Sequence, residues 1–407
     1  MNPGDAKRSL IRAVLGIVCL CCGWAVGQAP PAGSQTNPSR SFGPNDCGRV
    51  DPAYIQTANE TGGIPMFLQR SEVGKSFQMV RESTRQNVST VLWASAHLEG
   101  KAPTFEIPVD SVTQRITFTF SVDTKGGKLV LKGPSGQVIG PGAAHTEDTE
   151  LNCGRIITVA GPEAGNWHAE ITGSGTFWIE AETQSDVYLI RAEFVKLGGR
   201  IGHEGLFPIH GQPLVGSTAT LQASISAKET RTAEFSLVTQ QGETIKKLRM
   251  KQDNSDREFL EFTGNVELPG VPFRVAVKGL DSHGKAYQRY DAGLFHAESL
   301  EVTPKLDFDE LAAGRTKQAV FAVRNLGAAR AFKVTVTDAR RFMTRVEPKE
   351  LSLGAGQTGS VRVDLTVPAG TAAGVGDDLV IVVTSTSGAA TSNSSVVHLD
   401  VAGHGKN

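Results

Sequence analysis

Residues Gly165 to Lys196 read GNWHAEITGSGTFWIEAETQSDVYLIRAEFVK, and this stretch decides the fold of the chain. Its apolar residues recur at every second position, which is the period of a β-strand with one buried face. They are Trp167, Ala169 and Ile171, then Phe177, Ile179 and Ala181, then Tyr188, Ile190, Ala192 and Phe194. The loop Gly173-Ser174-Gly175 has the length of a hairpin turn. The pattern predicts a hairpin followed by a third strand at the inner edge of an antiparallel β-sandwich.

Length and composition exclude several classes of function. With 407 residues the chain is long enough for three or four domains of ordinary size. Its 41 basic and 42 acidic residues give a formal net charge of −1, so no electrostatic field draws it to nucleic acid or to an anionic membrane. The sequence holds neither a Gly-x-Ser-x-Gly motif nor a reactive cysteine beside a histidine, so we expect no catalytic residue and no cofactor.

The N-terminus has the composition of a secretory signal peptide. Three basic residues between positions 7 and 12 precede the apolar run Ala13 to Val26, and small residues stand at the cleavage position before Gln28. A retained membrane anchor is the alternative, although the run is shorter than the about 20 residues that a span needs. We therefore expect a mature chain that is secreted to the extracellular space or the periplasm, without a membrane span.

Two cysteines remain once residues 1–27 are removed. They are Cys47 and Cys153, an even count in a compartment that permits disulfides, so we expect them to be bridged. In the chain-entropy account, closing a loop of about a hundred residues contributes on the order of 4 to 5 kcal/mol.

Residues 51–86 have helical rather than strand periodicity. Asp51 and Pro52 begin a helix that ends at Gly62, residues 64–68 predict a short strand, and Ser71 begins a second helix that runs to about Arg85. Two helices and one strand cannot close a core alone. We therefore expect this segment to pack on the following sandwich or on a partner.

This segment resembles the end of a von Willebrand factor A domain. The resemblance is carried by YIQTANETGGIPMFLQRSEV, in which a helix, Thr-Gly-Gly, a last strand and Ser-Glu-Val lead into a final helix. Domains of that family bind a metal through Asp-x-Ser-x-Ser, a motif that occurs nowhere in this sequence. Metal-dependent adhesion is therefore not implied here, and we expect no metal site.

Residues 51–295 together resemble the hemicentin-like extracellular proteins. The resemblance lies in the order of a von Willebrand-like tail, a sandwich with Gly-Asn-Trp and Gly-Ser-Gly-Thr-Phe, and a module with Leu-Pro-Gly-Val-Pro-Phe and Gly-Leu-Asp-Ser-His-Gly-Lys. It implies that the first sandwich has the galactose-binding-like fold, a name that describes shape and not sugar binding. The last module resembles the immunoglobulin-like repeats of bacterial secreted proteins.

The predicted fold class is mainly β, with tandem antiparallel β-sandwiches after a short N-terminal α/β segment. One sandwich is of the jelly-roll or galactose-binding-like type and two are immunoglobulin-like. Because interfaces between such domains are usually modest, we expect an extended rod. The expected parts are a signal peptide (1–27), a disordered leader (28–46), the helix-strand-helix segment (47–86), the galactose-binding-like sandwich (87–200), the two immunoglobulin-like sandwiches (201–298 and 299–402) and a tail (403–407).

The polar face of the quoted stretch is the candidate ligand-binding site. The expected hairpin places five side chains together on its outward side, where the core does not require a large aromatic residue. They are His168, Glu170, Trp178, Glu180 and Glu182. An indole flanked by carboxylates can stack on a sugar ring and accept its hydroxyl protons. The alternative is that the helical segment or a loop covers Trp178.

Other polar clusters fit known sites less well. Gly74-Lys75-Ser76 lacks the first glycine of a phosphate loop, because Gln69 stands five positions before Gly74. The histidine cluster His203, Glu204 and His210 lacks the spacing of a zinc site. Residues 253–256 and 307–310 are acidic turns, and neither follows the residue order of an EF-hand.

The residues thus predict a secreted, non-enzymatic protein of adhesion or extracellular interaction, whose partner is an unidentified extracellular protein or glycan and not nucleic acid. One alternative is a carbohydrate-binding module that uses the aromatic and carboxylate face. Another is an accessory subunit of a secreted hydrolase. Asn59, Asn87 and Asn393 begin Asn-x-Ser/Thr triplets, which matter only in a host that glycosylates proteins.

Overall fold

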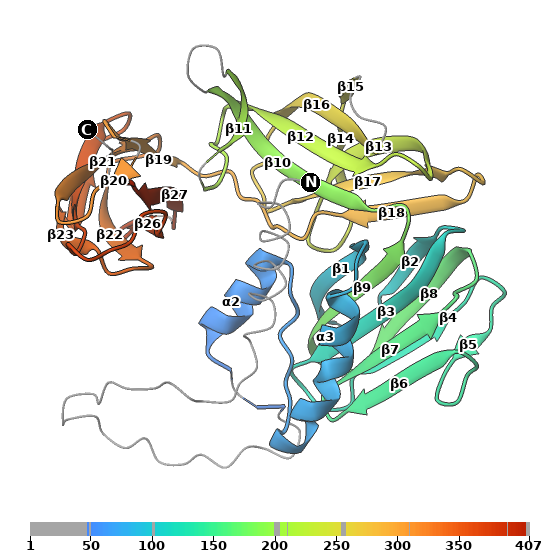
Figure 1. The fold of residues 1–407 in the computed structure, drawn as a ribbon. Coiled ribbons are helices and arrows are strands. Elements are labelled where there is room, and N and C mark those ends of the chain that lie inside the picture. The colour runs from blue at the N-terminus through green and yellow to red at the C-terminus, as the bar shows by residue number, and fades with distance from the viewer. Residues whose placement is uncertain are drawn as a thin grey trace, which may run out of the picture. The chain divides into compact units, whose positions relative to one another are not determined.

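The computed structural model describes residues 47–48, 50–99, 102–198, 204–209, 211–253, 258–308, 310–388 and 390–403. These residues form two compact units (Figure 1). The first unit contains the described residues of 47–193, 221–264 and 272–295, and the second those of 194–220, 265–271 and 296–403. The expected signal peptide and leader lie outside the described residues.

The described chain is mainly β, as predicted, and the first unit holds a four-stranded and a nine-stranded sheet. The smaller sheet contains β2 (Thr104–Val109), β4 (Lys128–Lys132), β5 (Val138–Ile139) and β8 (Gly165–Thr172), in the order β2-β8-β4-β5. The larger contains β1 (Val88–Leu98), β3 (Thr113–Val122), β6 (Thr146–Leu151), β7 (Gly154–Ala160), β9 (Gly175–Ser185), β13 (Thr230–Val238), β14 (Thr244–Lys247), β17 (Arg274–Asp281) and β18 (Ala286–Tyr290). Its order is β14-β13-β17-β18-β1-β9-β3-β7-β6.

The predicted hairpin of β8 and β9 is wrong, because the two strands lie in facing sheets. Strand β8 pairs with β2 and β4, whereas β9 pairs with β1 and β3. The apolar faces are nevertheless the predicted ones: Trp167 of β8 packs on Phe118 of β3 across the sandwich, with ring centroids 6.0 Å apart. Alternation fixes which face is buried, and an arch between two sheets satisfies it as well as a hairpin within one.

Glycine geometry at the turn explains why the chain crosses over. Gly173 and Gly175 have φ of 120° and 92°, and a Cβ on Gly175 would lie 2.3 Å from Oδ1 of Asp123. That carboxylate accepts a hydrogen bond from the backbone N–H of Thr176, at 2.8 Å. The loop after β3 therefore holds the start of β9 beside β3.

The nine-stranded sheet joins the first sandwich to the module that follows it. Strands β1 and β18 are antiparallel neighbours, with Thr90 opposite Tyr290. Beside this seam Arg289 and Asp110 form a fully buried ion pair, and Arg289 Nε also donates to the carbonyl of Val187 at 2.8 Å. The modest interface expected between these two modules is therefore wrong, because a shared sheet and a paired buried charge connect them.

The helical segment packs on the outer face of the nine-stranded sheet (Figure 1). It contains α2 (Pro52–Thr61), the 3-10 helix η1 (Arg70–Ser76) and α3 (Phe77–Ser83). Asp51 caps α2 by accepting from the N–H of Ala53 at 3.0 Å, and Gly62 ends the helix with φ of 81°. Residues 64–68 form neither helix nor strand, so the predicted short strand is wrong. Hereafter residues 51–86 are called the helical cover.

Three further sheets complete the described chain. A five-stranded sheet, ordered β11-β10-β12-β16-β15, contains β10 (Leu189–Gly198), β11 (Gly205–Pro208), β12 (Thr218–Ser226), β15 (Lys251–Asp253) and β16 (Phe259–Glu267). The expected third strand of the quoted stretch, β10, thus lies in another sheet than β8 and β9.

The C-terminal sandwich has sheets ordered β19-β21-β25-β23 and β20-β27-β26-β22-β24. Their strands are β19 (Leu300–Lys305), β20 (Glu310–Leu311), β21 (Thr316–Asn325), β22 (Arg330–Asp338), β23 (Met343–Glu347), β24 (Glu350–Leu353), β25 (Thr358–Thr366), β26 (Gly376–Ser385) and β27 (Ser392–Val401).

The predicted disulfide is present and ties the start of the described chain to the first sandwich. Cys47 and Cys153 are bonded, with Cα atoms 5.9 Å apart and a sequence separation of 106 residues. Cys153 is 3% exposed and belongs to the core cluster of this sandwich. The helical cover lies within the loop that the disulfide closes.

Replacing both Cys47 and Cys153 by Ala is expected to lower the free energy of unfolding of the first unit by up to about 4 to 5 kcal/mol, because the unfolded chain regains loop entropy. Urea unfolding of the purified chain, followed by tryptophan fluorescence, measures the change. The wild-type chain in reducing buffer is the matched control and should approach the variant. An unchanged unfolding midpoint in both would contradict the prediction.

Candidate functional site

The five predicted ligand-binding residues do not lie together. His168 and Glu170 are on the outer face of β8, where Glu170 Oε2 is 3.6 Å from Nζ of Lys132. Trp178, Glu180 and Glu182 are on β9, on the outer face of the opposite sheet. The predicted five-residue face is therefore split between the two sides of the sandwich, because β8 and β9 do not form a hairpin.

Trp178 is covered by the helical cover. Its side chain is 3% exposed, and its ring centroid lies 5.7 Å from that of Phe67. The indole Nε1 donates to Oδ1 of Asn59 in α2, at 3.0 Å. The side chain thus satisfies its one polar group inside the protein and presents no ring face to a ligand.

Arg274 of β17 forms the centre of a buried junction between the cover and the sheet. Its guanidinium lies over the ring of Trp93, with Cζ 4.1 Å from the centroid. Nη2 donates to the carbonyl of Asn59 at 2.8 Å, and Nη1 donates to the carbonyl of Ala292. Because the last carbonyls of a helix lack partners within the helix, a cation at this position both pairs with α2 and complements its dipole.

The end of α2 receives further donors at the same junction. The N–H of Leu294 donates to the carbonyl of Glu60 at 3.1 Å, and the indole of Trp93 to that of Gly63 at 3.2 Å. A Cβ on Gly62 would lie 2.2 Å from the carbonyl oxygen of Ala292. Only glycine therefore allows the helix end to approach the chain this closely.

Two carboxylates on the outer face of β9 have perturbed pKa values. Burial raises the pKa of Glu180 well above its ordinary value, the charge of Glu182 raises it further, and Arg274 and a hydrogen bond from Thr90 oppose the shift. Burial raises the pKa of Glu182 to about 7. Burial also lowers the pKa of Arg274 to about 10. Such a pair could act as a proton donor, but the cover lies over the strand that carries it.

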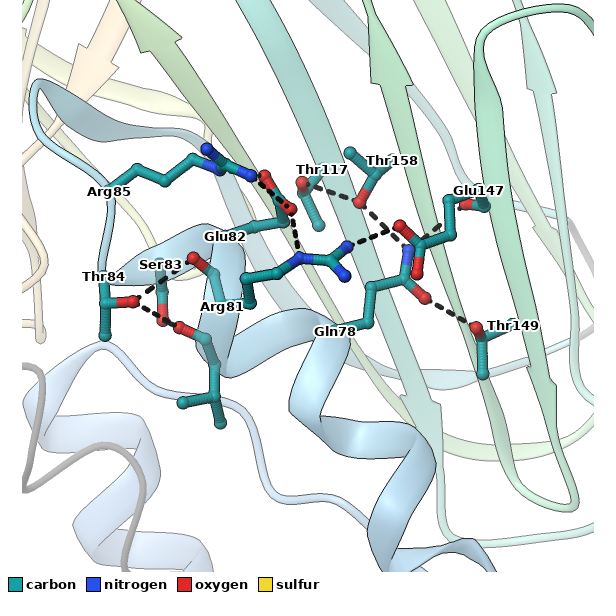
Figure 2. A network of polar contacts seen from close by, with 11 residues as sticks. Gln78, Arg81, Glu82, Ser83, Thr84, Arg85, Thr117, Glu147, Thr149 and Thr158 are labelled. Carbon is teal, nitrogen blue, oxygen red and sulfur yellow. Dashed lines mark hydrogen bonds and ion pairs between the residues drawn. The ribbon is translucent and has the colours of Figure 1, made fainter.

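A polar network attaches α3 to the sheet (Figure 2). The amide of Gln78 donates to Oγ1 of Thr158 at 3.0 Å and accepts from Oγ1 of Thr149 at 2.6 Å. Glu82, 3% exposed, accepts from Arg81 at 2.8 Å and from Arg85 at 2.6 Å. Burial opposes ionisation of Glu82, yet these two arginines lower its pKa. The helix is thus held by oriented polar groups in addition to apolar packing.

A depression of about 450 Å³ lies beside this network. It is lined by Gly74, Lys75, Phe77, Gln78, Val80, Arg81, Glu147 and Thr149. Lys75, part of the incomplete phosphate-loop motif, donates to the carbonyl of Glu150 at 3.0 Å. This lysine therefore binds a carbonyl of the edge strand β6 and does not act as the lysine of a phosphate-binding loop.

Among the described residues, no three histidine, cysteine or acidic side chains are placed to hold a metal ion. His203 and His210, and residues 254–256 and 309 of the two acidic turns, lie outside them. In the C-terminal sandwich, His398 lies between Asp378 and Asp400, at 2.8 Å and 3.3 Å. Both ring nitrogens are engaged there, so the ring offers no free ligand atom.

Sequence reasoning missed Arg274, Trp93 and Asn59. The only local signal was the position of Arg274 within VPFRVAVKG, where a charged residue interrupts an apolar strand. Such a residue must find partners when it is buried. Its partners stand 181 and 215 positions away in the sequence, counted to Trp93 (274 − 93) and Asn59 (274 − 59), so no local pattern could name them.

Comparison with known proteins gives a family assignment for the C-terminal sandwich. Residues 303–403 match the family model described as the VWA7 Ig-like domain. This module is therefore immunoglobulin-like, as its resemblance to secreted immunoglobulin-like repeats implied. Nothing tests the bacterial type expected of this module or the galactose-binding-like fold expected of the first sandwich, and both stay predictions.

Two proteins show weak similarity over longer stretches. Mouse hemicentin-1 is 22% identical over 245 residues, which are 60% of this chain and 4% of that protein. Human hemicentin-1 is 25% identical over 123 residues, which are 30% of this chain and 2% of that protein. The chain thus corresponds to a small fraction of either relative.

The ectodomain of mouse nectin-like molecule 4 is among the solved structures that align with this chain. It is 11% identical to this chain, and the alignment covers 73% of this chain and 97% of that one with a TM-score of 0.19. A Bacillus licheniformis lipase in its propeptide form, BlEst2, gives 11% identity, coverage of 54% and 44%, and a TM-score of 0.24. Scores this low support no inference about fold or activity.

Replacing Trp178 by Phe is expected to lower the free energy of unfolding by about 1 to 3 kcal/mol, because it leaves a small cavity and an unpaired Asn59 oxygen. A double-mutant cycle with Asn59→Ala isolates the hydrogen bond and should give a coupling of about 0.5 to 1.5 kcal/mol. Chemical denaturation of the four proteins measures both quantities. Strictly additive effects would contradict the hydrogen bond between Trp178 and Asn59.

Replacing Glu182 by Gln is expected to stabilise the protein above neutral pH. Because its folded pKa of about 7 exceeds the ordinary 4.5, the folded state keeps a proton between these values that the unfolded chain has lost. Stability therefore falls as pH rises through this window, and glutamine removes the loss. We expect a gain of about 1 to 2 kcal/mol near pH 8. The control is the urea midpoint of both proteins near pH 4, where residue 182 is neutral in each. An equal difference in stability between the two proteins at pH 4 and pH 8 would contradict the raised pKa of Glu182.

Proposed function

We propose that this chain is part of a secreted, non-enzymatic protein of extracellular adhesion or interaction. The immunoglobulin-like match over residues 303–403 is the observation that carries the proposal. Immunoglobulin-like sandwiches are common in cell-surface proteins, and their loops and edges can bind partners without any reaction centre. The similarity to hemicentin-1 agrees with the resemblance of residues 51–295 to the hemicentin-like extracellular proteins.

The disulfide supports an oxidising compartment. Cys47 and Cys153 are the two cysteines outside the apolar N-terminal run, and they are bonded to each other. Structural disulfides persist in secreted proteins and are rare in the cytosol. Among the described helices, none is long and apolar enough to cross a membrane.

A protein partner is favoured over a glycan by the burial of the tryptophan side chains. The three tryptophans of the described chain, Trp93, Trp167 and Trp178, are 2%, 1% and 3% exposed. The predicted sugar-binding face needs an open indole on which the sugar stacks, and none of these indoles offers one. No described residue favours an accessory subunit of a hydrolase, so that alternative has no support of its own.

The full chain, expressed in animal cells that secrete proteins, is expected in the medium with Cys47 and Cys153 oxidised. The purified chain should bind immobilised extracellular matrix proteins saturably and give no signal on a glycan array. The fraction in the medium, mass mapping under non-reducing conditions and surface plasmon resonance measure these outcomes. Retention in the cytosol with free thiols would refute secretion, and binding confined to glycans would favour the carbohydrate-binding alternative.

A further inference from the structure

The three Asn-x-Ser/Thr triplets have very different surroundings in the folded chain. Asn87 stands in the turn between α3 and β1, and its side chain is exposed. Asn59 is half-buried in α2, and Asn393 is 4% exposed in β27. An N-linked glycan is bulky and hydrated, so a folded protein accommodates it only where the amide nitrogen faces water.

The backbone at Asn87 suits a fixed, outward-pointing side chain. Its φ of 59° is left-handed, a conformation that asparagine tolerates better than most residues. Its carbonyl accepts from the N–H of Ser185 at 3.2 Å, which anchors the turn to the end of β9. Within the described chain, the side-chain amide of Asn87 has no hydrogen-bond partner. A sugar attached there would displace no contact of the fold.

Asn393 has the opposite environment. Its Nδ2 donates to the carbonyls of Leu300 at 2.7 Å and Gln212 at 3.1 Å, and its Oδ1 accepts from the N–H of Gln212 at 2.7 Å. A glycan replaces one hydrogen of this nitrogen and would remove one of these two bonds. The side chain is also closely packed, since a Cβ on Gly211 would lie only 2.1 Å from Oδ1 of Asn393. The folded C-terminal sandwich therefore excludes a glycan at this asparagine.

From this contrast we propose that Asn87 is a site of N-linked glycosylation and that Asn393 is not. The proposal rests on the proposed function, because the modification requires entry into the secretory pathway. Asn59 is outside the proposal, since its amide already holds the indole of Trp178. A glycan at Asn87 would shield the turn between the helical cover and β1, so protein partners would bind at other edges and loops of the first unit.

The test follows two forms of the full chain in animal cells, one with its own N-terminus and one preceded by a heterologous cleavable signal peptide. Digestion with peptide N-glycosidase in heavy-oxygen water leaves a labelled aspartate at each asparagine that carried a glycan. Mass spectrometry of the peptides then reports each site separately. We expect label at Asn87 in the majority of molecules and none at Asn393.

Matched variants keep the backbone requirements of each site. Asn87→Asp and Asn87→Gly both tolerate a left-handed φ and should lose one glycan while the amount secreted changes by no more than about twofold. Asn393→Asp removes two donors of the C-terminal sandwich and should lower the yield severalfold without removing a glycan.

Each outcome bears on one proposal. An unlabelled Asn87 in the form carried by the heterologous signal would overturn the glycosylation site, and so would a labelled Asn393 in secreted, folded protein. If the form with its own N-terminus stays in the cytosol while the other form is secreted with a glycan at Asn87, the proposed secretion is refuted and the glycosylation site is supported.

Discussion

The buried guanidinium of Arg274 is the interaction on which the arrangement of the first unit depends. A cation that is 1% exposed is unfavourable unless its hydrogens and its charge find partners. Here the partners come from three parts of the chain: the carbonyl of Asn59 in α2, the ring of Trp93 in β1, and the carbonyl of Ala292 after β18. The helical cover, the first sandwich and the following module are therefore fixed at one point.

The outer face of the nine-stranded sheet is built to receive this cover. Its central strands β1 and β9 present Trp93 and Trp178, and its strands β6 and β7 at one edge present Thr149 and Thr158. The cover contacts both groups. Phe67 and Asn59 meet Trp178, and Gln78 meets Thr149 and Thr158. The raised pKa values of Glu180 and Glu182 follow from the same burial. Features that in isolation suggest a ligand site are here the contact surface for a segment of the same chain.

A shared sheet gives the first unit its second means of cohesion. Strand β1 belongs to the first sandwich and β18 to the following module, and they pair at Thr90 and Tyr290. The buried pair of Arg289 and Asp110 lies beside them, with Ser185 donating to the same carboxylate at 2.8 Å. An ion pair with additional donors is specific in geometry even where it adds little stability, because a displaced partner would leave a buried charge unpaired. This favours one fixed orientation of the two modules over a flexible linker.

The sequence by itself determined the class of fold, the buried face of most strands, the bridge between Cys47 and Cys153 and the start of α2, because each depends on spacing, composition or a cap within a few residues. It could not determine the partner of a strand. The face that buries Trp167 is the same whether β9 turns back beside β8 or crosses to the opposite sheet, and the two are distinguished by the pairing of β9 with β1 and β3. The exposure of Trp178 was likewise undecided, since it depends on Asn59 and Phe67, which lie more than a hundred residues earlier. Tertiary structure decided these points because hydrogen bonds and buried charges act between neighbours in space, whatever their distance along the chain.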